Sequence, residues 1–315
     1  MIERKKKISI VVPCFNEEGN VANMAEAIRT VMAGLPQYEY ENIFIDNDSS
    51  DGTQSVLRKC AASDRRIKAI FNNRNFGPDC SSFHGMLSAD GDAVVSICCD
   101  FQEPPEMITD FVREWEKGAK VVWGQRRKTA GSPVMAFTRS VYYKLIRKFS
   151  DLPQYDNVIG FGLYDREVMN ELKAMHDPAP FIRNMVPMLG YKPVLLPYDQ
   201  RERASGKSSY SLFSYFNTAL MGMVHTSKVP LKLAIWAGML FSCLSFFVGV
   251  FYLVYKLMFW DSFSVGQAPL VIMVSLIASL QLFFLGILGE YVLAIQDRVS
   301  FSKWVVEKER INFDD

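Results

Sequence analysis

Short β-rich runs alternate with helical stretches through the first 122 residues of this 315-residue chain. The runs that favour strands cover 8–13, 42–46, 67–71, 93–99 and 119–122. The stretches that favour helices lie between them, over 20–33, 53–61, 78–88 and 105–116. Strands that alternate with helices in this way form a mostly parallel sheet with helices on both faces. The sequence therefore predicts a doubly wound α/β domain of the Rossmann type.

Polar side chains follow four of the expected strands, at the point where each strand ends. The run 93–99 is followed by Asp100 and Gln102, and then by two prolines that stop a strand and can open a helix. Ligands of open α/β sheets bind at the carboxyl ends of strands, and carboxylate and amide oxygens suit a hard divalent cation. Taken one at a time, each cluster is also what a capped strand-to-helix turn contains. The four clusters together favour a binding site.

Two later stretches, Leu233–Tyr255 and Ala268–Gly289, contain no charged residue. Each is long enough to cross a hydrocarbon core of about 30 Å as a helix, and a buried hairpin of a soluble domain is the alternative. Lysines and arginines flank the outer ends, whereas the loop 258–267 carries Asp261 and no basic residue. The positive-inside rule then places both termini in the cytosol. We expect a transmembrane hairpin with spans over 233–256 and 268–291.

The composition argues against several classes of protein. A net charge of +1 gives no electrostatic case for binding nucleic acid. The six cysteines show neither disulfide nor metal-knuckle spacing, so we expect reduced thiols. Lys5–Lys7 precede an apolar run that is too short for a signal peptide. Two amphipathic stretches, 134–149 and 212–224, would lie in a membrane interface or pack against the sheet.

The polar motifs occur in an order that resembles a known family. They read Val-Pro-x-Phe-Asn-Glu from Val12, Asp-Asn-x-Ser-x-Asp-Gly-Thr from Asp46, Asn-Arg-Asn-Phe-Gly from Asn73, and Asp-Phe-Gln-Glu-Pro-Pro from Asp100. This order looks like that of the GT-A glycosyltransferases of family 2. It resembles in particular the polyprenyl-phosphate glycosyltransferases, which include dolichol-phosphate mannose synthases and bactoprenol glucosyltransferases. Pro180–Arg183, Arg203–Tyr210 and the expected hairpin fit the same group, so the likeness covers nearly the whole chain.

The resemblance implies a nucleotide-sugar donor, a lipid-phosphate acceptor and a divalent cation, Mg²⁺ or Mn²⁺. By motif, the residues that would contact the nucleotide are Pro13, Phe15, Glu17, Asp46, Asn47, Cys98, Cys99 and Ser208. Asp100 and Gln102 would hold the metal against the diphosphate, where the cation neutralises charge as the leaving group departs. Arg126, Arg139 and Arg203 would bind phosphate, since guanidinium groups match phosphate oxygens, and a solvated or headgroup role is the alternative.

The chain departs from the family pattern at two positions. Many relatives have Asp-x-Asp-x-Gln, and here Cys98 stands first. A thiol is a poor ligand for Mg²⁺, so the metal would depend on donor phosphates to complete its shell. Relatives often carry an aspartate, proposed as a base, where this chain has Gly160, and Asp156 is a displaced candidate. A phosphate acceptor is already mostly a dianion at pH 7 and needs no base, unlike a sugar hydroxyl. Glu103 is interpreted as a charge at the start of a helix.

We therefore expect an inverting glycosyltransferase that moves a sugar to a polyprenyl phosphate, with a UDP-sugar and undecaprenyl phosphate favoured. A cytosolic GT-A catalytic domain would cover 1–207, a juxtamembrane amphipathic helix 208–230, the hairpin 231–295 and a cytosolic tail 296–315. The protein would be integral to a bacterial inner membrane, with the lipid bilayer as a partner, and could form homo-oligomers. Two alternatives stay open: a family-2 enzyme that elongates a glycan on a hydroxyl, and a catalytically silent membrane scaffold of the same fold.

Overall fold

The computed structural model describes residues 4–127, 153, 155–177, 180–201, 267–299 and 305–313, with isolated positions between 236 and 258. The chain divides into two compact units. The first consists of Met1–Val141, Leu152–Tyr210 and Arg298–Asp315, and the second of Tyr142–Asp151 and Ser211–Asp297. The C-terminal residues therefore belong to the same unit as the N-terminal ones.

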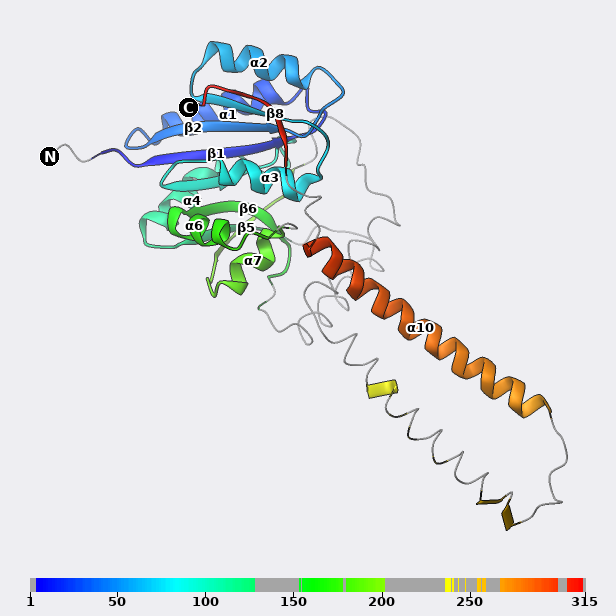
Figure 1. The fold of residues 1–315 in the computed structure, drawn as a ribbon. Coiled ribbons are helices and arrows are strands. Elements are labelled where there is room, and N and C mark those ends of the chain that lie inside the picture. The colour runs from blue at the N-terminus through cyan, green and yellow to red at the C-terminus, as the bar shows by residue number, and fades with distance from the viewer. Residues whose placement is uncertain are drawn as a thin grey trace. The chain divides into compact units, whose positions relative to one another are not determined.

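An eight-stranded sheet forms the centre of the described part of the first unit (Figure 1). Its strands are β1 (Lys7–Cys14), β2 (Glu39–Asp46), β3 (Ile67–Asn72), β4 (Ala93–Ser96), β5 (Val121–Arg126), β6 (Val158–Asp165), β7 (Val194–Tyr198) and β8 (Glu307–Ile311). Their order across the sheet is β7-β5-β6-β4-β1-β2-β3-β8. The pairs β1–β2, β1–β4, β2–β3 and β5–β7 are parallel, whereas β6 and β8 run antiparallel to their neighbours. The expected α/β fold with a mostly parallel sheet is confirmed.

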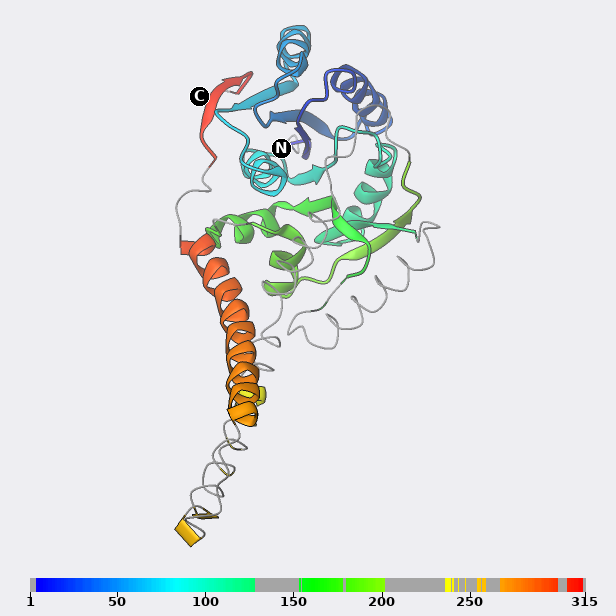
Figure 2. The ribbon, with the colours of Figure 1, turned by 90° about the vertical axis from the view of Figure 1, so that its right-hand side faces the viewer.

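Helices cover both faces of this sheet (Figure 2). They are α1 (Val21–Ala33), α2 (Thr53–Ser63), α3 (Pro78–Leu87), α4 (Met107–Glu116), α6 (Arg166–Ala174) and α7 (Ile182–Met188). Buried residues of α1, α2 and α4 form one core with the sheet, and those of α3, α6 and α7 form a second core. Successive residues of β1 serve opposite faces, since Ile10 and Val12 belong to the first core and Val11 to the second. Burial on both faces explains why these strands read as continuous apolar runs.

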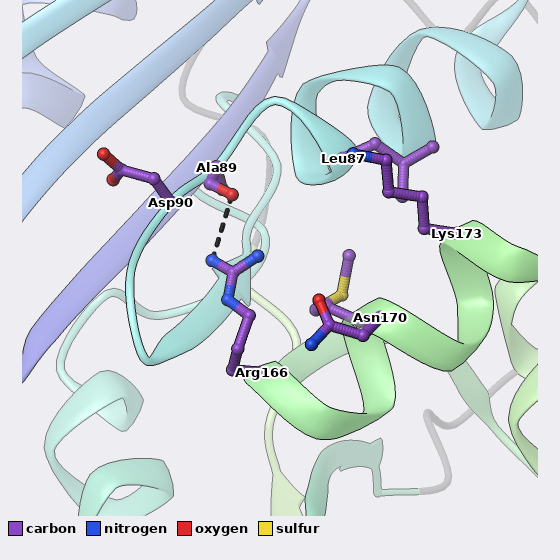
Figure 3. A pocket seen from close by; sticks show the side chains of 7 residues that line it. Leu87, Ala89, Asp90, Arg166, Asn170 and Lys173 are labelled. Carbon is purple, nitrogen blue, oxygen red and sulfur yellow. Dashed lines mark hydrogen bonds between the residues drawn. The ribbon is translucent and has the colours of Figure 1, made fainter.

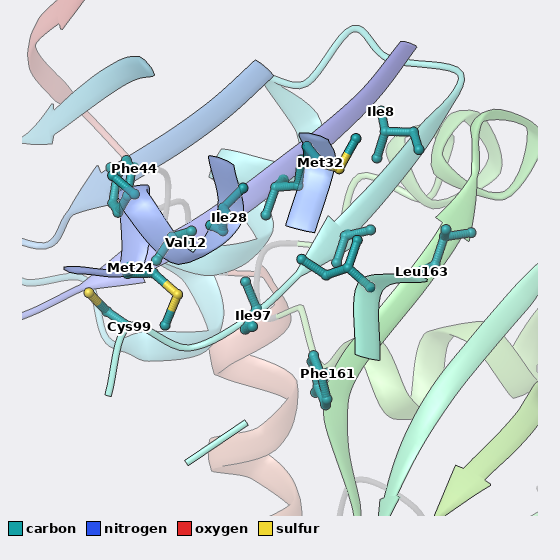
Figure 4. Packing of buried hydrophobic residues seen from close by; sticks show 14 of the residues in the cluster. Ile8, Val12, Met24, Ile28, Met32, Phe44, Ile97, Cys99, Phe161 and Leu163 are labelled. Carbon is teal, nitrogen blue, oxygen red and sulfur yellow. The ribbon is translucent and has the colours of Figure 1, made fainter. Parts of the chain in front are cut away.

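Side chains of α1 and of the sheet pack together in the first core (Figure 4). Met24 and Ile28 of α1 are fully buried in one cluster with Val12 and Phe44 of the sheet. Burying side chains of this size contributes about 1.5–3 kcal/mol each. The loops at the carboxyl edge therefore follow strands that are held by a tightly packed core.

Three features of the sheet differ from the sequence-based expectation. β4 ends at Ser96 rather than at Cys99, because the Cys98 N–H donates to the Glu103 carboxylate and not to a strand. β6 and β7 were not expected: β6 lies antiparallel between β4 and β5, and β7 pairs in parallel with β5. β8, in the C-terminal tail, pairs with β3 at the edge of the sheet, and its charged sequence is typical of edge strands.

The described part of the second unit is mainly α10 (Gln267–Val299), a helix of 33 residues that includes the expected second span. Several of its large apolar side chains are exposed, among them Leu282 and Phe283. Among the described residues, no helix is both long enough and apolar enough to cross a membrane. The expected transmembrane hairpin stays a prediction. The first expected span lies largely outside the described residues, and both amphipathic stretches lie wholly outside them.

Candidate active site

The loops that follow β1 and β2 are joined by hydrogen bonds at the carboxyl edge of the sheet. Asn16 has a φ of 57°, a left-handed conformation that asparagine tolerates. Its N–H donates to Ser49 Oγ at 2.8 Å, and its Oδ1 accepts from the Ser50 N–H at 2.9 Å. The clusters after the first two strands therefore form a single surface.

Of the residues expected at the nucleotide, Pro13 lies near the end of β1, and Phe15 and Glu17 lie in the loop that follows. The Phe15 side chain is 45% exposed, and Pro13 is half-buried. The Glu17 N–H donates to Thr53 Oγ1 at 2.8 Å, and its Oε2 accepts from Asn20 Nδ2 at 2.6 Å. The Glu17 carboxylate is thus oriented by the start of α1, and Phe15 is left free to contact a planar ligand.

Asp46 lies at the end of β2 and is fully buried. Its Oδ2 accepts from Gln54 Nε2 at 2.8 Å and from the Ser49 N–H at 3.2 Å. Its Oδ1 is buried and has no hydrogen-bond partner among the described residues. Burial raises the pKa of Asp46 above its ordinary value. A buried acceptor of this kind is costly unless a ligand supplies a donor.

A network of asparagine amides holds the next loop, 72–77, in place. Asn47 Oδ1 accepts from Asn72 Nδ2 at 3.1 Å and from the Phe76 N–H at 3.0 Å. Asn47 Nδ2 donates to Asn75 Oδ1 at 2.9 Å, and Asn72 also donates to Ser81 Oγ at 3.0 Å. Asn47 therefore shapes the site by fixing this loop, a role that its place in the motif did not reveal.

Asp100 and Gln102, the expected metal ligands, lie together in a tight loop after β4. Asp100 is 7% exposed, and its Oδ1 accepts from the Gln102 N–H at 3.1 Å. Phe101 between them has a φ of 60°, and the Arg201 N–H donates to the Gln102 carbonyl at 3.2 Å. Within the described residues no group of three or more His, Cys, Asp or Glu side chains could hold a metal ion. A carboxylate and an amide oxygen nevertheless fit Mg²⁺ or Mn²⁺, which often bind one or two carboxylates together with substrate phosphates.

Glu103 is not the helix-start charge that the sequence suggested. α4 begins only at Met107, and Glu103 is buried with 2% exposure. Its Oε2 accepts from the Cys98 N–H at 2.7 Å, and its Oε1 has no hydrogen-bond partner among the described residues. Burial raises the pKa of Glu103 to about 7. The hydrogen bond from the Cys98 N–H and, after it, the charge of the nearby Arg126 oppose this rise.

The two cysteines of this loop differ in environment. Burial, and then the carboxylate of Glu103, raise the pKa of Cys98 well above its usual range, so its thiol stays protonated and is a poor metal ligand. Cys99 is 2% exposed and belongs to the first core (Figure 4), where its thiol contacts that of Cys14. Cys99, which the motif places at the nucleotide, thus lies in the core.

Arg126 ends β5 at the same edge of the sheet. Its Nε donates to the Tyr198 hydroxyl at 3.3 Å, and its backbone N–H donates to the Asn157 carbonyl at 3.1 Å.

Gly160 on β6 has a φ of 95°, and a Cβ there would lie 3.0 Å from Ile182 Cγ2. A carboxylate-bearing residue would be strained at this position, which accounts for glycine. Asp156 is half-buried just before β6, with its carbonyl accepting from Gln125 Nε2 at 3.0 Å. Arg139, Arg203 and Ser208 lie outside the described residues.

A cavity of about 290 Å³ lies at the opposite edge of the sheet, where β4 begins (Figure 3). Its lining residues are Leu87, Ala89, Asp90, Arg166, Met169, Asn170 and Lys173. The Arg166 guanidinium donates to the carbonyls of Gly91, at 2.7 Å, and Ala89, at 2.9 Å. These bonds hold the loop before β4, so the cavity is separate from the candidate site.

Comparison with known proteins gives similarity over nearly the whole chain. The family described as Glycosyl transferase family 2 matches residues 9–173. A protein of Shigella flexneri named SfII prophage-derived bactoprenol glucosyl transferase is 32% identical over 305 residues, which is 96% of this chain and 98% of that protein. The uncharacterized glycosyltransferase YkcC of Bacillus subtilis is 33% identical over 297 residues, 94% of this chain and 91% of its own.

The solved structures of other proteins that resemble this chain have lower sequence identity to it than these two relatives. A mannosyltransferase from Pyrobaculum calidifontis in complex with GDP-Man and Mn²⁺ is 14% identical, with a TM-score of 0.47 over 94% of this chain and 88% of its own. Glucosyl-3-phosphoglycerate synthase from Mycobacterium tuberculosis, in complex with Mn²⁺, UDP and phosphoglyceric acid, is 16% identical, with a TM-score of 0.49 over 70% of this chain and 76% of its own.

Proposed function

The chain belongs to glycosyl transferase family 2, and we propose that it transfers a sugar from a nucleotide-sugar to a polyprenyl phosphate with inversion at the anomeric carbon. The observation that carries this proposal is the similarity to proteins named bactoprenol glucosyl transferase, which extends over 96% of the chain. A match of this extent includes the segments beyond the family domain, where an acceptor site would lie.

The nucleotide end of the donor is proposed to bind at Asp46. Its buried Oδ1 lacks a hydrogen-bond donor among the described residues, and uracil presents one imide N–H that would supply it. The exposed ring of Phe15 lies on the surface that the same loops form, where it could stack on a base. These features favour a UDP-sugar.

The diphosphate is proposed to bind at the Asp100 loop with a divalent cation. Asp100 and Gln102 would hold Mg²⁺ or Mn²⁺, which neutralises the charge that develops on the leaving diphosphate. Arg126 ends β5 at the same edge of the sheet, and its guanidinium would bind the diphosphate there. The proposed roles of Arg139 and Arg203 in binding phosphate rest on their positions in the sequence.

Gly160 stands where relatives often carry an aspartate that is proposed as the catalytic base, and a phosphate acceptor needs no such base. The second pKa of a phosphate monoester is about 6, so the attacking oxygen is already ionised at pH 7. A sugar hydroxyl would need a general base, and the backbone at Gly160 disfavours the residue that would carry one. This chemistry favours a lipid phosphate over a glycan hydroxyl.

We further propose that the second unit contacts the lipid bilayer on the cytosolic side, so that the acceptor keeps its tail in the membrane. The apolar stretches of the sequence and the exposed side chains of α10 support this, because large exposed apolar surfaces mark membrane or protein contacts. Self-association of α10 would cover the same side chains and stays a prediction.

Release of UDP by the purified full-length protein tests the proposal. We expect release from one member of a UDP-sugar panel with Mn²⁺ and undecaprenyl phosphate, and none without the lipid. Asp100→Ala should reduce the rate at least about 100-fold, whereas Asp110→Ala, an exposed position on α4, should leave it unchanged. Turnover with a glycan acceptor but not with the lipid phosphate would support the elongating alternative, and no turnover with any nucleotide-sugar would support the silent scaffold.

A further inference from the structure

The loop that carries the proposed metal ligands receives little support from the sheet. β4 ends at Ser96, and the last backbone bond to a neighbouring strand is from the Ile97 N–H to the Val11 carbonyl, at 3.1 Å. The next N–H, that of Cys98, donates to the Glu103 side chain at 2.7 Å. One buried carboxylate therefore takes the place that a strand carbonyl would hold, and it closes the loop from 98 to 103.

The loop has a conformation that needs such a closure. Phe101, at its tip, is a non-glycine residue with a φ of 60°, which the side chain disfavours. Asp100 Oδ1 accepts from the Gln102 N–H at 3.1 Å, so the carboxylate and the amide are fixed relative to each other. The Arg201 N–H tethers the Gln102 carbonyl at 3.2 Å on the other side. The Glu103 carboxylate is thus the anchor at the base of the loop.

A purely structural explanation does not account for a carboxylate at this position. Glu103 is 2% exposed, and burying a charge-bearing side chain is costly unless it has a specific partner. Its partner is the backbone of Cys98, the position at which this chain lacks the acidic residue of the Asp-x-Asp-x-Gln pattern. Exposed Glu106, three residues later, has no comparable contact, and its carboxylate pairs with Arg201 at 3.3 Å.

From this geometry we infer that Glu103 is a positioning residue that holds Asp100 and Gln102 in the arrangement that binds the divalent cation. The inference rests on the proposed function, because it assigns the metal site to that loop. Groups that orient metal ligands without touching the metal typically change metal affinity about 10- to 100-fold when they are removed. Glu103 therefore compensates in part for the carboxylate that position 98 does not supply.

Binding of Mn²⁺ to the full-length protein in the presence of UDP, measured from the electron paramagnetic resonance signal of free Mn²⁺, tests this inference. We expect Glu103→Ala to weaken Mn²⁺ binding about 10- to 100-fold. Glu103→Gln keeps an oxygen that accepts from the Cys98 N–H, and should restore most of the affinity. Asp110→Ala, at an exposed position on α4, is the control and should bind Mn²⁺ as the unmodified protein does.

Binding of uridine, which has no phosphate, reports separately on the Asp46 region and should be unchanged in Glu103→Ala. Equal Mn²⁺ affinity in Glu103→Ala and the unmodified protein would overturn the inference while leaving the proposed function intact. Loss of uridine binding together with Mn²⁺ binding in both Glu103 variants would reduce Glu103 to a general folding role and overturn it as well. If the unmodified protein binds no Mn²⁺ with UDP, the proposed metal site itself is wrong, and the inference falls with it.

Discussion

Replacing Glu41 by glutamine removes the negative charge from a buried ionic cluster at the amino end of the sheet. Glu41, on β2, is 2% exposed. Its Oε2 lies 2.8 Å from Lys7 Nζ and 2.7 Å from Lys68 Nζ, on the two neighbouring strands. Its Oε1 accepts from Ser9 Oγ at 2.5 Å and from the Asp90 N–H at 3.2 Å. One carboxylate therefore joins β1, β2 and β3 to the loop before β4.

The size of the effect follows from the pKa of this carboxyl. Burial alone would raise the pKa of Glu41, but its hydrogen-bond donors and the two ammonium groups hold it at about 2, against an ordinary value of 4.5. A difference of this size corresponds to a contribution of about 3 kcal/mol to the free energy of unfolding at pH 7. Because the folded-state pKa is the lower one, the contribution is fully present above about pH 4.5 and is lost as the pH falls toward 2.

Urea unfolding followed by the fluorescence of the buried Trp115 and Trp123 measures this contribution. We expect Glu41→Gln to lower the unfolding free energy by about 3 kcal/mol at pH 7 and by only about 1 kcal/mol at pH 3. Glu39→Gln, on the same strand but exposed, should change it by less than about 0.5 kcal/mol. A cost for Glu41→Gln below about 1 kcal/mol at pH 7, or one that does not shrink in acid, would refute the reasoning.

Three further changes test other parts of the molecule. Cys98→Asp should keep or raise the rate of UDP release and lower the Mn²⁺ concentration for half-maximal rate, since it restores an oxygen ligand; an inactive variant would contradict our account of the metal loop. Glu307→Gln should loosen β8. Burial alone would raise the pKa of Glu307, but hydrogen bonds from His84 and Arg310 outweigh it and hold this pKa at about 2. The resulting contribution to stability is present above about pH 4.5 and is lost as the pH falls toward 2. Faster amide exchange at the Asn73 N–H, which donates to the Val306 carbonyl, measures this loosening, and unchanged exchange argues against it. Gly162→Ala should lower the free energy of unfolding in urea by at least about 2 kcal/mol, because the new Cβ would lie 2.1 Å from the Val122 carbonyl oxygen on the neighbouring strand. An equally stable variant would show that β5 and β6 can separate there.

The repeating strands and helices of the first 122 residues were predictable because their signals are local. Apolar runs of strand length, such as 67–71, became strands, and the stretch from 53 became α2. The polar clusters were predictable for the same reason, since each directly follows its strand in the chain. The parallel topology then brings Asp46 and Asp100 to one edge of the sheet, as the alternation implied.

Other properties of the site depend on residues far apart in the chain. Glu103 was interpreted as a charge at the start of a helix, yet it is buried near Arg126 and Tyr198, which come from β5 and β7. The motif predicts that Asn47 contacts the nucleotide, and only the structure shows that its amide also holds a loop that begins 25 residues later.

The sequence by itself determined that this chain forms a mostly parallel α/β sheet with acidic and amide side chains at its carboxyl edge. Tertiary structure alone decided that β6 inserts antiparallel beside β4, that the C-terminal β8 closes the sheet at β3, and that Glu103 supports the Asp100 loop from inside. The physical reason is that hydrophobic periodicity records which face of an element is buried, but not which distant element covers it. The environment of a buried carboxylate is set by those distant partners, and so is its function.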